Sequence, residues 1–268
     1  MHQDLGYAAK TELFEGRLER ERQHFNRLAE KADADSLRMP RWNVDRYRNP
    51  SETTEFPLEY AFHLLGDLCG KTVVDLGCGE GLNTVILASL GAQVISVDIS
   101  DKSLELTLKR AKANGIASSV RLVHSDAAGI PLNDAEADRV LCAAILHHVD
   151  SAATARQIHR ILKPDGVAVF EEPMTGPNWV GTIKKFLPKN PAATEDENPL
   201  TLEQVRTVSH EVGRQGRSRY FGVIARIVPR FKATFETSAR AHRMDRWLTH
   251  HIPLAWAFAS PLVWEAHK

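Results

Sequence analysis

Three glycines follow a carboxylate in the stretch "VVDLGCGEGLN". Because glycine has no side chain, the backbone at Gly77, Gly79 and Gly81 can approach a ligand closely, with the N-terminus of the following helix beneath it. A dinucleotide fingerprint, G-x-G-x-x-G, would need a glycine where this sequence has Leu82. Asp75 would also repel a pyrophosphate, whereas its charge suits an ammonium group. The pattern therefore favours a phosphate-free ligand with a positively charged end.

Two further carboxylates follow the next strand-like runs. Asp98 ends the run in "VISVDIS", where it can accept hydrogen bonds from both hydroxyls of a ribose. Asp126 stands in "VHSDAAG", a position that suits contact with an adenine amino group, although an aspartate there could also simply cap a turn. S-adenosylmethionine combines an amino-acid end, a sulfonium and a ribose without any phosphate, so we predict it as the cofactor.

Candidate catalytic groups stand in "ILHHVD" and "FEEP", after the fourth and fifth strand-like runs. Adjacent residues near a strand end face opposite sides, so one of His147 and His148 should point at the substrate. We predict His147 as a general base and His148 as a structural or cofactor-proximal residue. One of Glu171 and Glu172 should also reach the pocket, and Glu172 is the alternative base. The competing interpretations are a packing histidine and two solvated carboxylates.

These side chains need strands that end at one edge of a sheet. Apolar, strand-like runs alternate with helical patterns through the middle of the chain, which predicts a parallel, doubly wound α/β sheet. The residues "LKPDG" indicate a stop between a helix and a strand. The predicted strands cover residues 72–76, 93–97, 120–124, 137–143 and 167–171, and the predicted helices cover 81–90, 101–113 and 152–162.

The flanking sequence predicts further elements. Residues 10–31 have the spacing of an amphipathic helix, and residues 58–70 that of a helix leading into the sheet. After an irregular stretch beyond Pro173, we predict a helix at 201–213 and a strand at 217–223. The final "PLVWEAHK" is expected to return as an edge strand.

The chain resembles the class I S-adenosylmethionine-dependent methyltransferases, in particular their small-molecule, type 11-like group. The resemblance rests on D-x-G-x-G-x-G, the acids after the second and third strands, the "HHV-D" strand end and "LKPDG", in this order between residues 58 and 173. It implies a mostly parallel, seven-stranded Rossmann-like fold and methyl transfer to a small-molecule acceptor, with oxygen or nitrogen favoured and carbon possible. The cofactor contacts that it implies are Asp75, Gly77, Cys78, Gly79, Gly81, Asp98, Ile99, Asp126, Ala127 and Ala143.

The expected organisation follows from this resemblance. Residues 1–57 would form an N-terminal helical lid or flank, and residues 58–268 the Rossmann-like methyltransferase domain, with insertions on the substrate side at 174–260. Residues 214–251 hold a local surplus of arginine and lysine. This surplus is either a solvated helix face or a recognition surface for an acidic, glycosidic or lipid-linked substrate. The weaker candidates for substrate contacts are Trp42, Tyr47, Arg219 and Tyr220.

Composition limits the possible partners. The 268 residues contain 34 Lys plus Arg and 34 Asp plus Glu, so no overall field attracts nucleic acid or a membrane surface. The three cysteines have neither a C-x-x-C spacing nor clustered histidines, which argues against a disulfide framework and a metal site. The N-terminus lacks a signal-like pattern, and no apolar run is long enough to span a membrane. We therefore expect a soluble, cytoplasmic protein without stable membrane insertion.

Other function classes remain open at this point. A nicotinamide-dependent oxidoreductase would share the fold, although Asp75 and Leu82 oppose it. A non-catalytic cofactor-binding module on the same fold is a further alternative. A nucleic-acid methyltransferase would usually show N/D-P-P-Y/F at the fourth strand end, where this sequence has "AILHHV".

Overall fold

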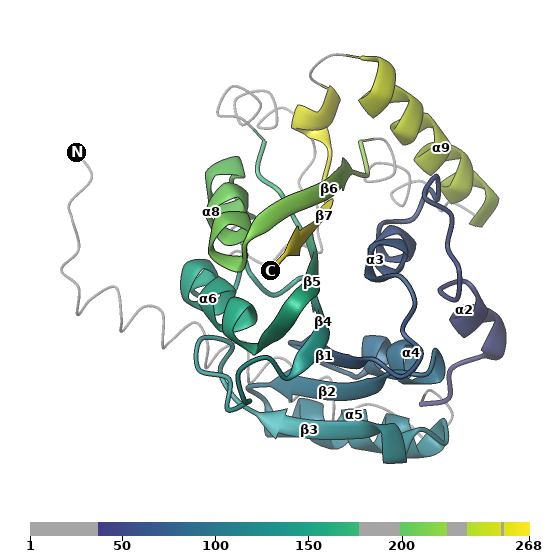
Figure 1. Cartoon of the computed structure of the whole chain (residues 1–268). Coiled ribbons are helices and arrows are strands. Elements are labelled where there is room, and N and C mark those ends of the chain that lie inside the picture. The colour runs from purple at the N-terminus through teal and green to yellow at the C-terminus, as the bar shows by residue number, and fades with distance from the viewer. Residues whose placement is uncertain (1–36, 177–198, 224–234, 253–254) are drawn as a thin grey trace.

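The computed structural model describes residues 37–176, 199–223, 235–252 and 255–268 (Figure 1). Its strands are β1 (Thr72–Leu76), β2 (Gln93–Asp98), β3 (Val120–His124), β4 (Ala137–Ala143), β5 (Leu162–Glu172), β6 (Arg214–Tyr220) and β7 (Leu262–His267). They form one seven-stranded sheet in the order β3-β2-β1-β4-β5-β7-β6. The pairs from β3 to β5 are parallel, whereas β7 runs antiparallel to both of its neighbours. The predicted α/β fold with a mostly parallel, seven-stranded sheet is thus confirmed.

Helices cover both faces of this sheet. They are α2 (Arg41–Asp45), α3 (Pro57–Leu65), α4 (Leu82–Ser89), α5 (Asp101–Ala113), α6 (Ser151–Ile161), α8 (Leu202–Val212) and α9 (Phe235–His251), with short 3₁₀ turns at Ala117–Ser119 and Ala255–Phe258. In Figure 1, α6 and α8 lie together on one side of the sheet, and α3 and α4 lie on the other. Helix α9 lies beyond α3, near the end of the sheet formed by β6 (Figure 1).

Side-chain caps explain where three helices begin. The side chain of Ser100 accepts a hydrogen bond from the backbone N–H of Ser103 at the start of α5. Asp150 caps α6 in the same way, and Thr201 and Gln204 form a reciprocal capping box at the start of α8. Such caps satisfy backbone donors that have no partner within the helix, typically stabilising it by about 1 kcal/mol.

The predicted bounds of β1, β3, β4 and α5 agree with the structure, and those of β2, α4, α6 and α8 differ by one or two residues. Helix α3 ends at Leu65, where Gly66 adopts a left-handed φ of 72°, five residues before the predicted end. The predicted strand at 217–223 begins three residues earlier, at Arg214, because it pairs there with His267 of β7. The predicted helix at 10–31 lies outside the described residues.

One prediction about strands was wrong. The final strand, β7, is an interior strand between β5 and β6, and five of its six residues are buried. Its buried Glu265 is paired with Arg217 of β6 at 2.9 Å (Nε to Oε1). Helix α6 ends at Ile161, directly before "LKPDG", as predicted. Strand β5 begins at Leu162, five residues before the predicted start, and residues 163–166 bulge out between the pairs Ala137–Leu162 and Arg139–Val167.

The core has one layer on each face of the sheet. On the α6 and α8 face, Trp264 of β7 stacks on Phe170 of β5 with ring centroids 4.7 Å apart. On the other face, Phe62 and Leu65 of α3 pack on the same strands. Because the sheet is covered on both faces, the carboxyl ends of its parallel strands are fixed relative to one another at one edge. Open α/β sheets bind ligands at this edge.

None of the described helices is long and apolar enough to cross a membrane.

Candidate cofactor pocket and acceptor side

A pocket of about 230 Å³ opens at the carboxyl ends of β1, β2, β3 and β4. Below we call it the cofactor pocket. Its described walls are Leu76, Gly77, Gly79, Val97, Asp98, Ile99, Ser125, Asp126, Ala127, Ala143, Ala144, Ile145, His148 and Val149. Two carboxylates stand among mostly apolar side chains, and the described lining contains neither lysine nor arginine.

The glycine loop is held open by the backbone of β2. The N–H groups of Gly77 and Cys78 both donate to the carbonyl oxygen of Val97, at 2.8 and 3.1 Å. A Cβ atom at Gly77 would collide with the side chain of Ile145. At Gly79, by contrast, φ is 50° and a Cβ atom would meet nothing within 4 Å. The open space above Gly79 is therefore available to a ligand.

Asp98 and Asp126 border the cofactor pocket while they also hold loops. The carboxylate of Asp98 accepts hydrogen bonds from the backbone N–H of Gly79 at 2.8 Å and of Ser100 at 2.9 Å. Burial raises its pKa, and these hydrogen bonds lower it in part. Asp126 accepts from the N–H of Ala128 at 2.9 Å, so it caps its turn and also lines the pocket. A carboxylate has about four lone-pair sites, which leaves capacity for ligand hydroxyl or amino groups.

Seven of the ten predicted cofactor contacts line the cofactor pocket, and three do not. Asp75 is buried behind the glycine loop, where it accepts a hydrogen bond of 2.6 Å from Thr84 Oγ1. The thiol of Cys78 lies 3.6 Å from Thr107 Oγ1, and Gly81 packs against the same threonine. These three residues support the loop from beneath. The seven lining residues are Gly77, Gly79, Asp98, Ile99, Asp126, Ala127 and Ala143.

Burial raises the pKa of Asp75 to about 7, with a smaller contribution from the nearby charge of Asp98. The hydrogen bond from Thr84 acts in the opposite direction. Thr84 Oγ1 also lies 2.8 Å from Ser96 Oγ, so a buried polar chain joins β1, α4 and β2. We expected Asp75 to face an ammonium group directly, but its carboxylate is engaged in this chain.

The loop after β4 is built on Glu172, which is fully buried at the end of β5. Its Oε1 accepts hydrogen bonds from the backbone N–H groups of Ile145 and Leu146, at 2.8 and 2.7 Å. Its Oε2 lies 2.7 Å from Nδ1 of His147, which is also buried. His147 and Glu172 therefore fix the loop and do not line the cofactor pocket, whereas the neighbouring His148 does.

Glu171 faces the other side of the sheet from Glu172, as neighbours in a strand do. It is half-buried, and its charge is felt by the hydroxyl of Tyr47, whose pKa is raised mainly by burial. Burial and the charge of Glu172 raise the pKa of Glu171 to about 7. Glu171 pairs across the sheet with Ala143, which lines the cofactor pocket. Of the two glutamates, Glu171 therefore shares a sheet face with a residue of the pocket wall.

The four weaker candidates for substrate contacts are not brought together. Trp42 on α2 is 65% exposed, whereas Tyr47 is buried against Phe62. Arg219 and Tyr220 follow one another in β6 and point to opposite faces: Arg219 toward Tyr60 of α3, and Tyr220 toward the core beneath α8.

Sequence reasoning missed several residues of the pocket wall. Ala144, Ile145 and Val149 belong to the loop after β4, and Ser125 precedes Asp126. Ala144 has a φ of 56°, an unusual backbone conformation for a residue other than glycine. No side-chain pattern in the sequence indicates such positions. Their place next to predicted contacts could have suggested them.

Residues 74–170 match the model of a family described as "Methyltransferase domain". The match runs from β1 to β5, so it contains the strands whose carboxyl ends form the cofactor pocket. This segment therefore has the sequence pattern of a methyltransferase domain. The resemblance to that family is thereby confirmed for the part of the chain that carries the motifs.

The methyltransferase domain also has relatives of known name. The ubiquinone biosynthesis O-methyltransferase of Bordetella pertussis is 34% identical over 112 residues, which are 39% of this chain and 44% of that protein. The chain therefore spans less than half the length of this curated relative.

Solved structures share the fold over a longer stretch. The geranyl diphosphate C-methyltransferase of Streptomyces coelicolor A3(2) has a TM-score of 0.62 at 16% identity, over 94% of this chain and 98% of that one. The [4+2]-cyclase SpnF has a TM-score of 0.51 at 16% identity, over 75% of each chain. Since one of these two is named for a cyclisation, likeness at this level shows the fold and not the reaction.

Substituting Gly79 and Gly81 by alanine should separate ligand binding from stability. Gly79→Ala adds a methyl group in open space at a left-handed φ, so we expect about 1 to 2 kcal/mol of strain and a marked loss of cofactor affinity. Gly81→Ala places its Cβ 2.7 Å from Thr107 Oγ1, so we expect the larger loss of stability. Urea unfolding and isothermal titration measure the two effects. Unchanged cofactor affinity in Gly79→Ala would contradict the placement of the ligand.

The buried carboxyl of Asp75 should make stability depend on pH. Its pKa is about 7 when folded and 3.8 as an ordinary aspartate, so the folded state holds the proton more tightly and its stability falls as pH rises from about 4 to about 7. Each pKa unit corresponds to about 1.4 kcal/mol. Asp75→Asn should remove this component, so its free energy of unfolding relative to the parent should rise between pH 5 and pH 8. The control is Asp101→Asn, which changes an exposed aspartate. If the difference in free energy of unfolding between Asp75→Asn and the parent does not depend on pH, the raised pKa of Asp75 is refuted.

Proposed function

We propose that the protein transfers a methyl group from S-adenosylmethionine to a small-molecule acceptor. The observation that carries this proposal is the lining of the cofactor pocket, which combines the exposed backbone of Gly77 and Gly79 with the carboxylates of Asp98 and Asp126 and has no described lysine or arginine. A nicotinamide dinucleotide brings a pyrophosphate, which such a lining repels. A sulfonium cofactor with a ribose and an ammonium group is attracted instead.

The residues of the pocket have distinct roles in holding this cofactor. The carboxylate of Asp98 accepts hydrogen bonds from the ribose hydroxyls, and that of Asp126 from the adenine amino group. Ile99 and Ala127 offer apolar surface to the adenine ring. The bare backbone at Gly79 leaves room for the amino-acid part.

S-adenosylmethionine, when bound, supplies a methyl group on a sulfonium that an in-line nucleophile can displace. The chain has to align the acceptor with that methyl group, and orientation of this kind can lower a barrier by about 7 to 11 kcal/mol. The loop after β4 can hold such an alignment, because Glu172 fixes the backbone of Ile145 and Leu146 directly beside the cofactor pocket. In this proposal His147 and Glu172 are positioning residues.

For an acceptor that arrives protonated, Glu171 is the general base. It lies on the sheet face that Ala143 shares, and its pKa of about 7 is close to the operating pH that makes a carboxylate an effective base. His148, which lines the cofactor pocket, is the second candidate. This assignment replaces the predicted pair His147 and Glu172, because their side chains are bound to one another beneath the loop.

The acceptor that we favour is methylated on oxygen. The relatives of the domain that are named O-methyltransferases support this choice. Carbon is the alternative acceptor atom, since the structural likeness to a C-methyltransferase covers more of the chain. We also propose that residues 37–57 and the described residues after 173 contribute to the acceptor side. The supporting observation is that Arg219 of β6 lies in one row of paired residues with Glu171.

Binding of S-adenosylmethionine should depend on Asp98. Asp98→Ala removes a charged acceptor and should weaken binding of S-adenosylmethionine and S-adenosylhomocysteine by about 1.5 to 3 kcal/mol, roughly 10- to 150-fold. Isothermal titration measures this, with Asp101→Ala as the control because Asp101 is exposed and does not line the pocket. Tight binding of NADH by the parent, with no binding of S-adenosylmethionine, would sink the proposed function.

The pH dependence of methyl transfer should report Glu171. With a hydroxyl acceptor, turnover of the parent should fall as pH drops below about 7, because the carboxyl of Glu171 becomes protonated. Glu171→Gln should lower turnover roughly 10²- to 10⁴-fold and remove this acid limb, while affinity for S-adenosylmethionine stays nearly unchanged. The control is Glu105→Gln on the exposed face of α5. An acid limb that persists in Glu171→Gln and disappears in His148→Ala would transfer the role to His148.

A further inference from the structure

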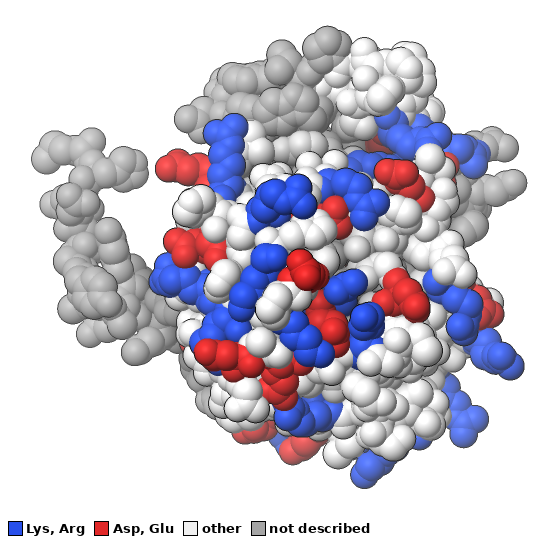
Figure 2. Space-filling model, viewed as in Figure 1, with Lys and Arg blue, Asp and Glu red and all other residues white. Residues whose placement is uncertain are grey.

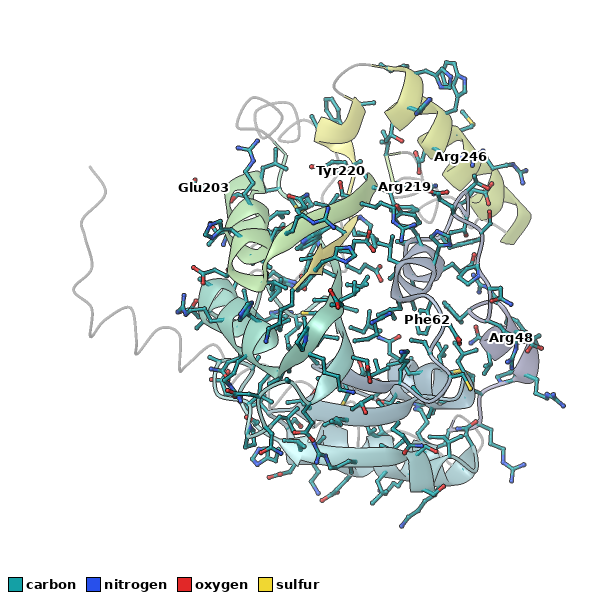
Figure 3. All side chains as sticks on the ribbon, in the orientation of Figure 1. Arg48, Phe62, Glu203, Arg219, Tyr220 and Arg246 are labelled. Atoms are coloured by element: carbon teal, nitrogen blue, oxygen red, sulfur yellow. The ribbon has the colours of Figure 1, made fainter. Side chains whose placement is uncertain are left out.

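A second cavity lies between α9, β6 and the loop that precedes α3. Its volume is about 700 Å³, and we call it the arginine cavity. Three arginines and two histidines share its described walls with a single carboxylate, and two aromatic rings add flat apolar surface. In Figure 3 Arg219 and Arg246 lie near one another between β6 and α9. The described walls are Glu52, Thr53, Tyr60, Ser218, Arg219, Arg243, Arg246, Trp247, His250 and His251.

The guanidinium group of Arg219 is held in place before any ligand arrives. Its two terminal nitrogens donate to the carbonyl oxygens of Glu52 at 3.0 Å and Thr54 at 2.6 Å. Its carbon lies 5.3 Å from the ring centre of Tyr60 and 4.5 Å from that of Phe221. A guanidinium has five N–H donors, so these bonds orient it without using its full capacity.

Arg246 brings a second positive charge to the same loop. Its Nη1 donates to the carbonyl oxygen of Thr53 at 3.0 Å, so three consecutive carbonyl groups hold two arginines side by side. Burial, and after it the charge of Arg246, lower the pKa of Arg219. Such a pair of like charges is costly without an anion between or beside them.

The charges of Glu55 and Glu52 act on the pKa of Arg219 in the opposite direction and offset the repulsion in part, without forming an ion pair with it. Glu59 of α3 is engaged by Arg46 at 2.7 Å and by the hydroxyl of Thr54. Among the described residues, no carboxylate lies within ion-pair distance of Arg219 or Arg246. Figure 2 shows Lys and Arg side chains over β6 and near α9, with acidic side chains among them, so the arginine cavity is a local feature of a chain with balanced charge.

Strand register places a residue of the arginine cavity and a residue of the cofactor pocket in one row on the same face of the sheet. Ala143 of β4 pairs with Glu171 of β5, Glu171 pairs with Val263 of β7, and Val263 pairs with Arg219 of β6. Paired residues of adjacent strands point to the same face, so this row of side chains faces α3. With about 4.8 Å between strands, the backbones of Glu171 and Arg219 are about 10 Å apart.

From this row we propose that the arginine cavity binds an anionic group of the methyl acceptor, a phosphate or a carboxylate, while the reacting atom lies about 10 Å away beside Glu171. The inference rests on the proposed methyl transfer and adds the class of acceptor. The arginines hold the anion, with charge-assisted hydrogen bonds from the donors of Arg219 and Arg246. The rings of Tyr60 and Trp247 can pack against an apolar or planar part of the same molecule.

The test measures anion binding separately from cofactor binding. Inorganic phosphate and benzoate serve as probes, titrated into the full chain by calorimetry at low salt, and S-adenosylmethionine is titrated into the same preparations. The variants are Arg219→Gln and Arg246→Gln. Arg246 is exposed, so its variant should fold even if Arg219→Gln does not. The control is Arg214→Gln, which changes an exposed arginine of the same strand outside the arginine cavity.

We expect saturable binding of at least one probe at one site, weakened about tenfold or more by Arg246→Gln and Arg219→Gln and unchanged by Arg214→Gln. The preferred probe distinguishes a phosphate from a carboxylate. Affinity for S-adenosylmethionine should be the same in all variants. The proposal is overturned if neither probe saturates, or if all three variants bind alike. If the unsubstituted protein does not bind S-adenosylmethionine, the proposed function is refuted, whatever the result with phosphate and benzoate.

Discussion

The parallel pairing of β1 with β2 and β4 brings backbone and side chains from distant parts of the chain to one edge. The N–H groups of Gly77 and Cys78 reach the carbonyl oxygen of Val97 only because β1 and β2 end at the same height. The next glycine of the loop, Gly79, donates its N–H to the carboxylate of Asp98 at the end of β2. A slip of one residue in the register would point each of these side chains to the opposite face. Both walls of the cofactor pocket therefore depend on this strand pairing.

Two buried carboxylates maintain this edge from opposite sides. Asp75 ties the glycine loop's strand to α4 through Thr84, and Glu172 ties the loop after β4 to the end of β5. Burying a carboxyl group is costly unless hydrogen bonds replace its water. Each of the two accepts such bonds, and the raised pKa of Asp75 shows that the compensation is incomplete there. The protein thus gives up some stability near neutral pH to hold a ligand site rigidly.

Much of the fold could be predicted because its signals are local. The alternation of apolar runs and helical patterns gave five parallel strands, and caps such as Ser100 lie where the sequence suggested a helix start. The position of β7 could not be predicted in this way. Whether "PLVWEAHK" is an edge or interior strand depends on β6 pairing outside it, and on Arg217, 48 residues away, neutralising Glu265.

The candidate site was predictable where the backbone makes the contact and less so where a side chain does. Gly77, Gly79, Asp98 and Asp126 lie in the pocket wall because their place at the strand ends fixes them there. For His147, His148, Glu171 and Glu172, strand alternation says only that neighbours face opposite sides. Which one faces the acceptor depends on which carboxylate the loop after β4 takes as its anchor. In the structure this carboxylate is Glu172, and Glu171 is left on the α3 face.

The antiparallel strands β7 and β6 extend the sheet beyond the residues that match the methyltransferase domain. Because β7 reverses direction and β6 reverses it again, β6 runs parallel to β5 and its last residues lie at the same edge as the cofactor pocket. Arg219 of β6 is thereby brought to the arginine cavity together with Arg243 and Arg246 of α9, and acidic residues elsewhere balance their charge in the chain as a whole. Exposed charges more than about 8 to 10 Å apart are largely screened in physiological salt, so only charges in one cavity act together on a ligand. The arginine cavity and the cofactor pocket share no described lining residue, so a change in the arginines can alter the charge of the cavity while the wall of the cofactor pocket stays the same.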